Sequence, residues 1–141
     1  MPTPSMEDHL ERIYLLIEQK GYARVMDIAS DLTLSPSSVT RMIQKLGDQG
    51  FVNYVKYRGI TLTPKGTTVA QTMSKKHQIL EEFLELIGVP EKHILGEVDG
   101  IEHHISLNTV MYMSNWILFI KQHPSIQDSF SLFSSERLIS N

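Results

Sequence analysis

Apolar residues recur at intervals of three and four near the start of the chain, the spacing of one helix face. Ser5 lies before them and has a side chain that can cap a helix N-terminus. Gly21 lies after them and is typical of a helix end. We therefore expect a first helix from about Ser5 to Gly21. The expected inward positions are Leu10, Ile13, Tyr14, Leu16 and Ile17.

Two shorter helical patterns follow, separated by three residues. The first covers 25–32, and the second starts at Ser35 and Pro36, a capping residue followed by a residue suited to the first helical position. The second helix should end near Gly47–Gly50. Its apolar face consists of Val39, Met42, Ile43 and Leu46. Two short helices joined by a three-residue turn are typical of a helix-turn-helix.

Two runs of strand-forming residues come next, at 51–55 and 59–63, and they predict a hairpin with a basic, aromatic tip. The remainder is expected to be helical, over 64–87, over about 91–106 with Gly96 and Gly100 as points of interruption, and from a cap at Asn108 to 121. A last, short helix with a frayed end is expected within 124–141. The predicted fold class is therefore mainly α with a small β wing, a winged helix-turn-helix followed by an all-helical domain.

Composition and charge narrow the function classes. The chain has 141 residues and a net charge of −3. It has no cysteine, so disulfides and thiolate metal sites are excluded. Residues 1–75 hold nine Lys/Arg and seven Asp/Glu, whereas 76–141 hold four Lys/Arg, nine Asp/Glu and five of the six histidines. A polyanion partner suits the first part and a cation suits the second. Neither a secretory signal nor a membrane span is evident, so a cytoplasmic location without membrane partners is expected.

The second helix of the helix-turn-helix and the hairpin tip offer the residues expected to contact double-stranded DNA. An α-helix fits the major groove, and a wing adds backbone or minor-groove contacts. A solvated polar helix face is the alternative interpretation, but the turn, the Ser-Pro start and the basic tip occur in the order that DNA binding requires. The candidate contacts are Ser35, Pro36, Ser37, Ser38, Thr40, Arg41, Gln44, Lys45, Lys56, Tyr57 and Arg58.

Carboxylates and imidazoles recur at same-face spacing on three predicted helices. Six residues from these helices could converge on a metal: Asp8, Glu11, His77, Asp99, Glu102 and His103. A buried cluster of four carboxylates needs cations to neutralise it. Oxygen and imidazole donors without sulfur suit manganese, iron or zinc, and the carboxylate majority favours manganese. Each residue alone has a structural alternative, as a helix N-terminal acid, a core histidine or a solvated glutamate.

Five segments in this order resemble the DtxR/MntR family of metal-dependent transcriptional repressors. They are Thr3–Asp8 with Glu11, Gly21–Val25, Pro36–Thr40, Lys56–Gly59 and Gly100–His104. Gly-Ile-Glu-His-His with the Asp8/Glu11 pair is the more specific part of the match. The Pro-Ser-Ser-Val-Thr segment matches only at the level of the group.

The resemblance implies a homodimeric repressor of manganese uptake genes. Residues 1–71 would bind operator DNA, and 72–141 would bind metal and dimerise. It also implies a binuclear site with two Mn²⁺ per subunit, in which Cd²⁺, Fe²⁺ or Zn²⁺ can substitute. Asp99 departs from the family, which usually has Glu there, so the carboxylate is one methylene shorter. No organic ligand is expected.

Three other functions fit part of the pattern. A carboxylate/histidine dimetal site could activate water in a metallohydrolase, but no nucleophile or general base is evident nearby, so we do not expect an enzyme. A winged-helix regulator could sense an organic ligand or nothing. Iron or zinc sensing through the same residues is the nearest alternative.

Overall fold

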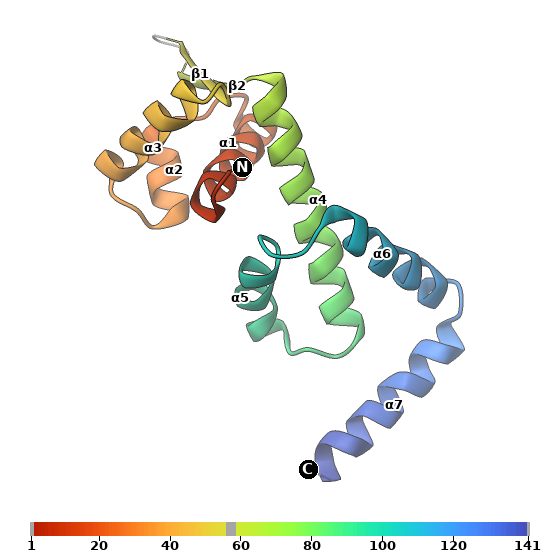
Figure 1. Ribbon diagram of the computed structural model, residues 1–141. Coiled ribbons are helices and arrows are strands. Elements are labelled where there is room, and N and C mark those ends of the chain that lie inside the picture. Colours follow the sequence, from red (N-terminus) through yellow and green to blue (C-terminus); the bar gives the residue numbers. More distant parts are fainter. Residues whose placement is uncertain (1, 56–58, 141) are drawn as a thin grey trace. The chain divides into compact units, whose positions relative to one another are not determined.

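The computed structural model describes residues 2–55 and 59–140, and the chain divides into two compact units, Met1–Ser74 and Lys75–Asn141. We call these the N-terminal unit and the helical unit. The boundary expected between residues 71 and 72 on functional grounds remains a prediction. The elements follow one another as shown in Figure 1.

Over its described residues, the N-terminal unit contains three helices, a two-stranded sheet and the start of a fourth helix. Helix α1 packs on α2 and α3, and the sheet packs on α1 and α3. The predicted winged helix-turn-helix is thereby confirmed. The elements are α1 (Pro4–Lys20), α2 (Val25–Leu32), α3 (Pro36–Asp48), β1 (Val52–Val55), β2 (Gly59–Leu62) and the first part of α4 (Pro64–Leu86).

The start of α1 differs from the prediction by two residues. Thr3 is the N-cap, and its side-chain oxygen accepts a hydrogen bond from the Met6 backbone N–H at 3.2 Å. Ser5, the predicted cap, lies inside the helix. Pro4 explains the difference, because proline lacks an N–H and its fixed φ suits the first helical position, which leaves Thr3 as the capping residue.

The turn between α2 and α3 is as predicted. Thr33 ends α2 in the left-handed region with φ of 56°. Ser35 caps α3 by accepting a hydrogen bond from the Ser38 backbone N–H at 3.2 Å, and Pro36 is the first helical residue. Short loops of this kind fix the second helix relative to the first.

The wing is an antiparallel hairpin with Val52 opposite Leu62 and Val55 opposite Gly59. Gly59 has φ of +84°, and a Cβ there would lie 2.7 Å from the carbonyl oxygen of Ala23, with which the strand makes an isolated bridge. Only glycine fits this position. The predicted basic tip, Lys56, Tyr57 and Arg58, lies outside the described residues.

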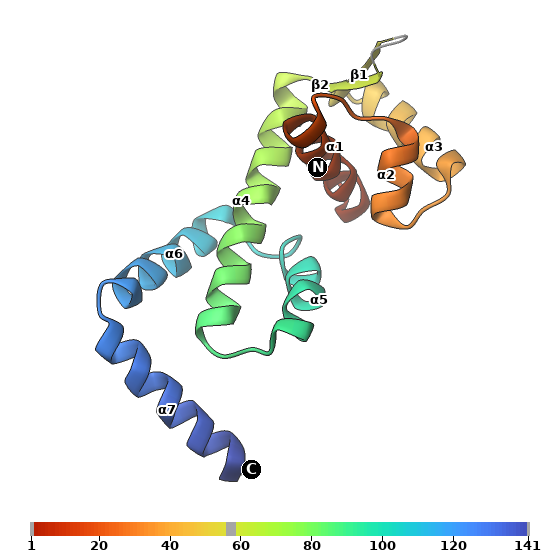
Figure 2. The same ribbon diagram turned by 180° about the vertical axis from the view of Figure 1, so that it is seen from behind.

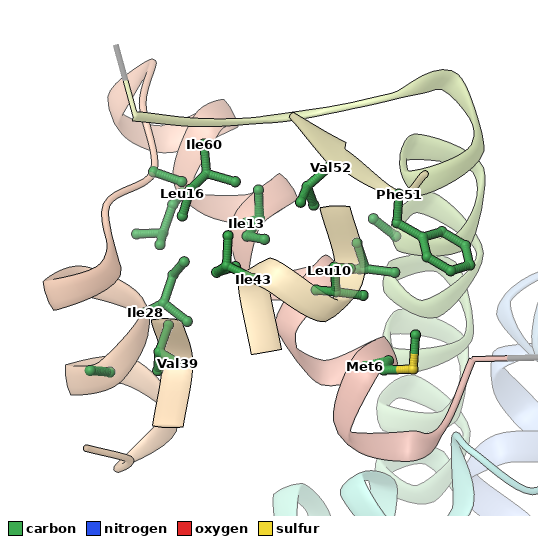
Figure 3. Close-up of a cluster of buried hydrophobic side chains, with 14 residues drawn as sticks. Met6, Leu10, Ile13, Leu16, Ile28, Val39, Ile43, Phe51, Val52 and Ile60 are labelled. Atoms are coloured by element: carbon green, nitrogen blue, oxygen red, sulfur yellow. The ribbon is translucent and has the colours of Figure 1, made fainter. Parts of the chain in front are cut away.

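The core of the N-terminal unit draws side chains from every helix and from the wing (Figure 3). Helical periodicity correctly predicted most inward positions of α1, because a face with apolar residues every three or four positions must be covered. Met42, expected inside, is only partly buried. The fully buried members labelled in the figure include Met6, Leu10, Ile13, Leu16, Ile28, Val39 and Ile60.

The helical unit consists of the remainder of α4 with α5 (Glu91–Ile101), α6 (Leu107–Lys121) and α7 (Pro124–Ser140), which Figure 2 shows from behind. Its core is formed by one α4 residue, two α5 residues and one α6 residue: Leu80, Ile94, Val98 and Val110.

Three boundaries in the helical unit correct the predictions. Helix α5 continues through Gly96 and Gly100 but ends at Ile101, and a turn follows it. Ser106 rather than Asn108 caps α6, because its side chain accepts from the Thr109 backbone N–H at 3.1 Å. Helix α7 has 17 residues and is not the short element expected.

Candidate metal centre and DNA-binding surface

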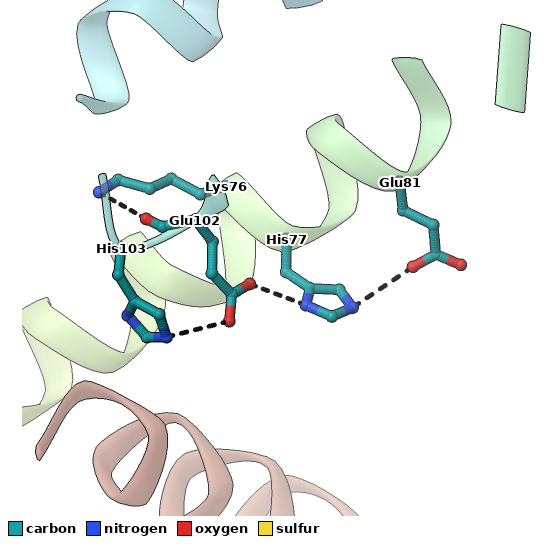
Figure 4. A network of polar contacts seen from close by, with 5 residues as sticks. All are labelled: Lys76, His77, Glu81, Glu102 and His103. Atoms are coloured by element: carbon teal, nitrogen blue, oxygen red, sulfur yellow. Dashed lines mark hydrogen bonds and ion pairs between the residues drawn. The ribbon is translucent and has the colours of Figure 1, made fainter. Parts of the chain in front are cut away.

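Glu102 is a buried carboxylate that lies between two histidines. It occupies the turn after α5, and only 2% of the residue is exposed. One carboxylate oxygen lies 2.9 Å from Nδ1 of His77 on α4, and the other lies 3.7 Å from Nε2 of His103. Figure 4 shows the two imidazoles approaching opposite oxygens of the same side chain. The sequence predicted all three residues as candidates, and the helical unit brings them together.

The three side chains suit a divalent first-row cation. Two adjacent ligands on an octahedral ion with bonds of about 2.1 Å lie about 3 Å apart, which is close to the His77–Glu102 separation. An ionised carboxylate only accepts hydrogen bonds, so the tautomer with the proton on Nδ1 of His77 suits this contact. A cation can replace that proton, since imidazole ligands bind metal in the neutral form with a free lone pair.

Two further residues contact this group, and the sequence reasoning missed both. Nε2 of His77 lies 3.5 Å from Oε2 of Glu81, one turn further along α4. The buried Lys76 donates from Nζ to the backbone carbonyl oxygen of Glu102 at 3.4 Å. The i,i+4 spacing from His77 could have indicated Glu81. No sequence signal indicates a buried lysine, because lysine is usually exposed.

The remaining predicted ligands lie on α5 and α1. Asp99 is in the last turn of α5 and is exposed. Asp8 and Glu11 belong to α1 of the N-terminal unit, three residues apart on one face, and both are half-buried. Their common face and partial burial suit a shared ligand.

Helix α3 presents the predicted DNA-contacting face to solvent. Its inward side consists of Val39, Ile43 and Leu46, while Arg41 and Lys45 supply two exposed cations on the other side. Ser38 is half-buried. The other predicted contacts on this helix and its cap are exposed: Ser35, Pro36, Ser37, Thr40 and Gln44.

Large apolar side chains are exposed along α6 and α7. Tyr112 is 70% exposed and Leu132 is 63% exposed, far above what a buried core allows. Exposed apolar side chains mark a contact surface where they form a contiguous patch. Within residues 2–55 and 59–140, none of the helices combines the length and apolar character of a membrane span.

Two family models together match most of this chain. The model for the iron dependent repressor N-terminal DNA binding domain matches residues 1–60, and the model for the iron dependent repressor metal binding and dimerisation domain matches residues 63–131. The HTH-type transcriptional regulator MntR of Lysinibacillus sphaericus is 52% identical over 126 residues, covering 89% of this chain and 91% of the relative. The protein of the same name from Listeria welshimeri is 48% identical over 137 residues, covering 97% and 96%.

A solved structure agrees with these matches. The manganese regulator SloR superposes with a TM-score of 0.72 at 28% identity, over 84% of this chain. The chain spans 55% of the SloR chain, so it corresponds to about half of that protein. The family resemblance, the fold class and the expectation of a regulator rather than an enzyme are confirmed. This chain belongs to the iron-dependent repressor family, among the HTH-type transcriptional regulators named MntR, and is a metal-dependent transcriptional repressor with a DNA-binding domain and a metal-binding and dimerisation domain.

Proposed function

We propose that this chain is a cytoplasmic, manganese-responsive repressor of manganese uptake genes that binds operator DNA as a homodimer. The names of two MntR relatives and of the manganese regulator SloR support manganese as the metal. The donor chemistry supports it independently, since carboxylate and imidazole ligands without thiolate suit Mn²⁺, with Cd²⁺, Fe²⁺ or Zn²⁺ as possible substitutes.

The proposed ligand set joins four residues of the helical unit with two carboxylates of the N-terminal unit. His77, Glu102 and His103 supply the part whose side chains already approach one another. The same-face pair on α1 and the carboxylate at the end of α5 supply the rest, in a binuclear site holding two ions per subunit. The additional proposed ligands are Asp8, Glu11 and Asp99.

The buried Glu102 carboxylate between two imidazoles is the observation that carries the proposal. A buried charge is costly unless opposite charge or hydrogen bonds compensate it. Bound Mn²⁺ would supply positive charge to this carboxylate and to the other three proposed carboxylate ligands.

Ligands from α1 and from the helical unit give metal binding a route to DNA binding. Without a cation the four carboxylates repel one another, so shared ligation is disfavoured and the N-terminal units of a dimer adopt many orientations. Shared ligation narrows this ensemble towards orientations in which both α3 helices face successive major grooves. A coupling free energy of about 1–3 kcal/mol, or about 5–150-fold in operator affinity, is typical of such linkage.

The proposal assigns operator contact to the exposed α3 face and the wing, and self-association to the helical unit. The first assignment rests on the two cations of α3 and the groove-fitting size of a helix. The second rests on the matched dimerisation domain and the exposed apolar residues of α6 and α7.

Calorimetric titration of the metal-free protein with Mn²⁺ tests the ligand assignment. Glu102→Gln removes the buried charge and should weaken Mn²⁺ binding at least about tenfold. Glu97→Gln is the matched control, because Glu97 is an exposed residue of the neighbouring helix. The Mn²⁺ affinity of this variant should equal that of the unaltered protein. Equal affinities for both variants would refute the assignment.

A further inference from the structure

Lys76 is buried although lysine almost never is without a partner. Only 8% of the residue is exposed, whereas the preceding Lys75 is exposed. Removing an ammonium group from water is unfavourable unless hydrogen-bond acceptors or opposite charges replace the lost solvation. The position of Lys76 therefore calls for an acceptor inside the helical unit.

The acceptor is the end of α5. Nζ of Lys76 donates to the backbone carbonyl oxygen of Glu102 at 3.4 Å, and Glu102 is the C-cap of that helix. The last carbonyls of a helix have no partner within it and form the negative end of its dipole, where a cation is favourable. The last turn of α5, which lies wholly within the described residues, contains no basic residue. Lys76 thus supplies from α4 the cation that the last turn of α5 lacks.

We propose that Lys76 is a positioning residue that holds the turn 102–105 in place before any metal binds. Two consecutive residues of α4 contact Glu102 (Figure 4). Lys76 contacts its backbone carbonyl and His77 contacts its carboxylate. The same turn carries His103. That Lys76 supports metal ligands rests on the proposed function, whereas its contact with the turn does not depend on that function. Preorganised ligands lose less freedom on binding.

Amide hydrogen exchange in the chelator-treated, metal-free protein tests this proposal. The Glu102 N–H donates to the Val98 carbonyl and the His104 N–H to the Ile101 carbonyl, both at 2.9 Å, so both amides report on the turn. In Lys76→Met these two amides should exchange at least about fivefold faster, while amides within α4 keep their protection. Lys75→Met removes the same charge from an exposed neighbouring position and should leave all these amides unchanged.

Equal exchange of the two amides in Lys76→Met and Lys75→Met would overturn the proposal. If methionine unfolds the helical unit, amides of α4 lose protection as well, and Lys76→Arg becomes the decisive variant. Arginine keeps a buried cationic donor, so the proposal predicts a folded unit with a protected turn. A folded arginine variant with an unprotected turn would overturn it. Since no metal is present, these outcomes are independent of the Mn²⁺ titration of Glu102→Gln.

Discussion

Two adjacent histidines after α5 have different environments. His103 is half-buried with Nε2 on the Glu102 side, whereas His104 is exposed. In an extended or turn segment, neighbouring side chains point in different directions, so only one of a pair can face a common site. The sequence motif Glu-His-His alone leaves this choice open, and the structure supports His103.

His103→Ala is predicted to weaken Mn²⁺ binding at least about tenfold, because an imidazole ligand is lost. His104→Ala removes the same group one residue later and should bind Mn²⁺ as the unaltered protein does. The measurement is the Mn²⁺ dissociation constant from calorimetry. A larger loss for His104→Ala than for His103→Ala would contradict the assignment.

The residue types at the candidate centre were predictable from sequence, but their supports were not. Helical spacing and donor chemistry indicated His77, Glu102 and His103, since metal ligands are restricted to a few side chains. Lys76 could not be found this way. Its role depends on α4 and the end of α5 lying side by side, and a local pattern does not contain that contact between residues 26 positions apart.

At the scale of elements, helix starts are set by small side-chain contacts. The prediction erred by two residues at α1 and α6, where more than one capping residue was available. The polar side chain that reaches a free backbone N–H decides the start. Helix α7 was underestimated for a different reason, because its apolar residues show little helical periodicity and many remain exposed.

The cap of α1 offers a direct test. Thr3→Ala should lower the free energy of unfolding by about 1 kcal/mol, since it removes the acceptor for the Met6 N–H. Ser5→Ala, at the position that sequence reasoning favoured, should change it by less than about 0.5 kcal/mol. Urea denaturation followed by circular dichroism measures both values. A greater cost for Ser5→Ala would restore the original prediction.

Two helical glycines should respond oppositely to alanine. A Cβ at Gly66 of α4 would lie 2.0 Å from the Phe51 carbonyl oxygen, whereas a Cβ at Gly96 of α5 has no neighbour within 4 Å. Gly66→Ala should destabilise the protein by about 1–3 kcal/mol through overpacking. Gly96→Ala should stabilise it by up to about 1 kcal/mol through helix propensity. Thermal unfolding midpoints that shift in the same direction would contradict this reading of the α4 packing.

At the scale of the whole molecule, charge differs between the first and second parts of the sequence. The excess of Lys/Arg lies in residues 1–75 and the excess of Asp/Glu in 76–141, although the net charge of −3 gives no hint of DNA binding. Affinity for DNA depends on the local distribution, because phosphate contacts are made by the facing surface alone.

Arg41 should contribute to operator affinity through the phosphate backbone or a base. If it contacts phosphate, Arg41→Gln lowers the slope of log affinity against log salt by about one. Lys92→Gln, an exposed cation of the helical unit, should leave the slope unchanged. Fluorescence anisotropy across a salt series measures both. An unchanged slope together with unchanged affinity for Arg41→Gln would remove this residue from the DNA-binding surface.

Ligation around Glu102 is proposed to control operator binding. Anaerobic titration of a labelled operator fragment with the unaltered chain, with and without Mn²⁺, tests it directly. Mn²⁺ should raise operator affinity by about 5–150-fold. The Glu102→Gln variant should lose that gain, while its operator affinity without metal stays equal to that of the unaltered chain. Operator affinity that ignores both Mn²⁺ and chelator, or a Glu102→Gln variant with the full manganese response, would contradict the account.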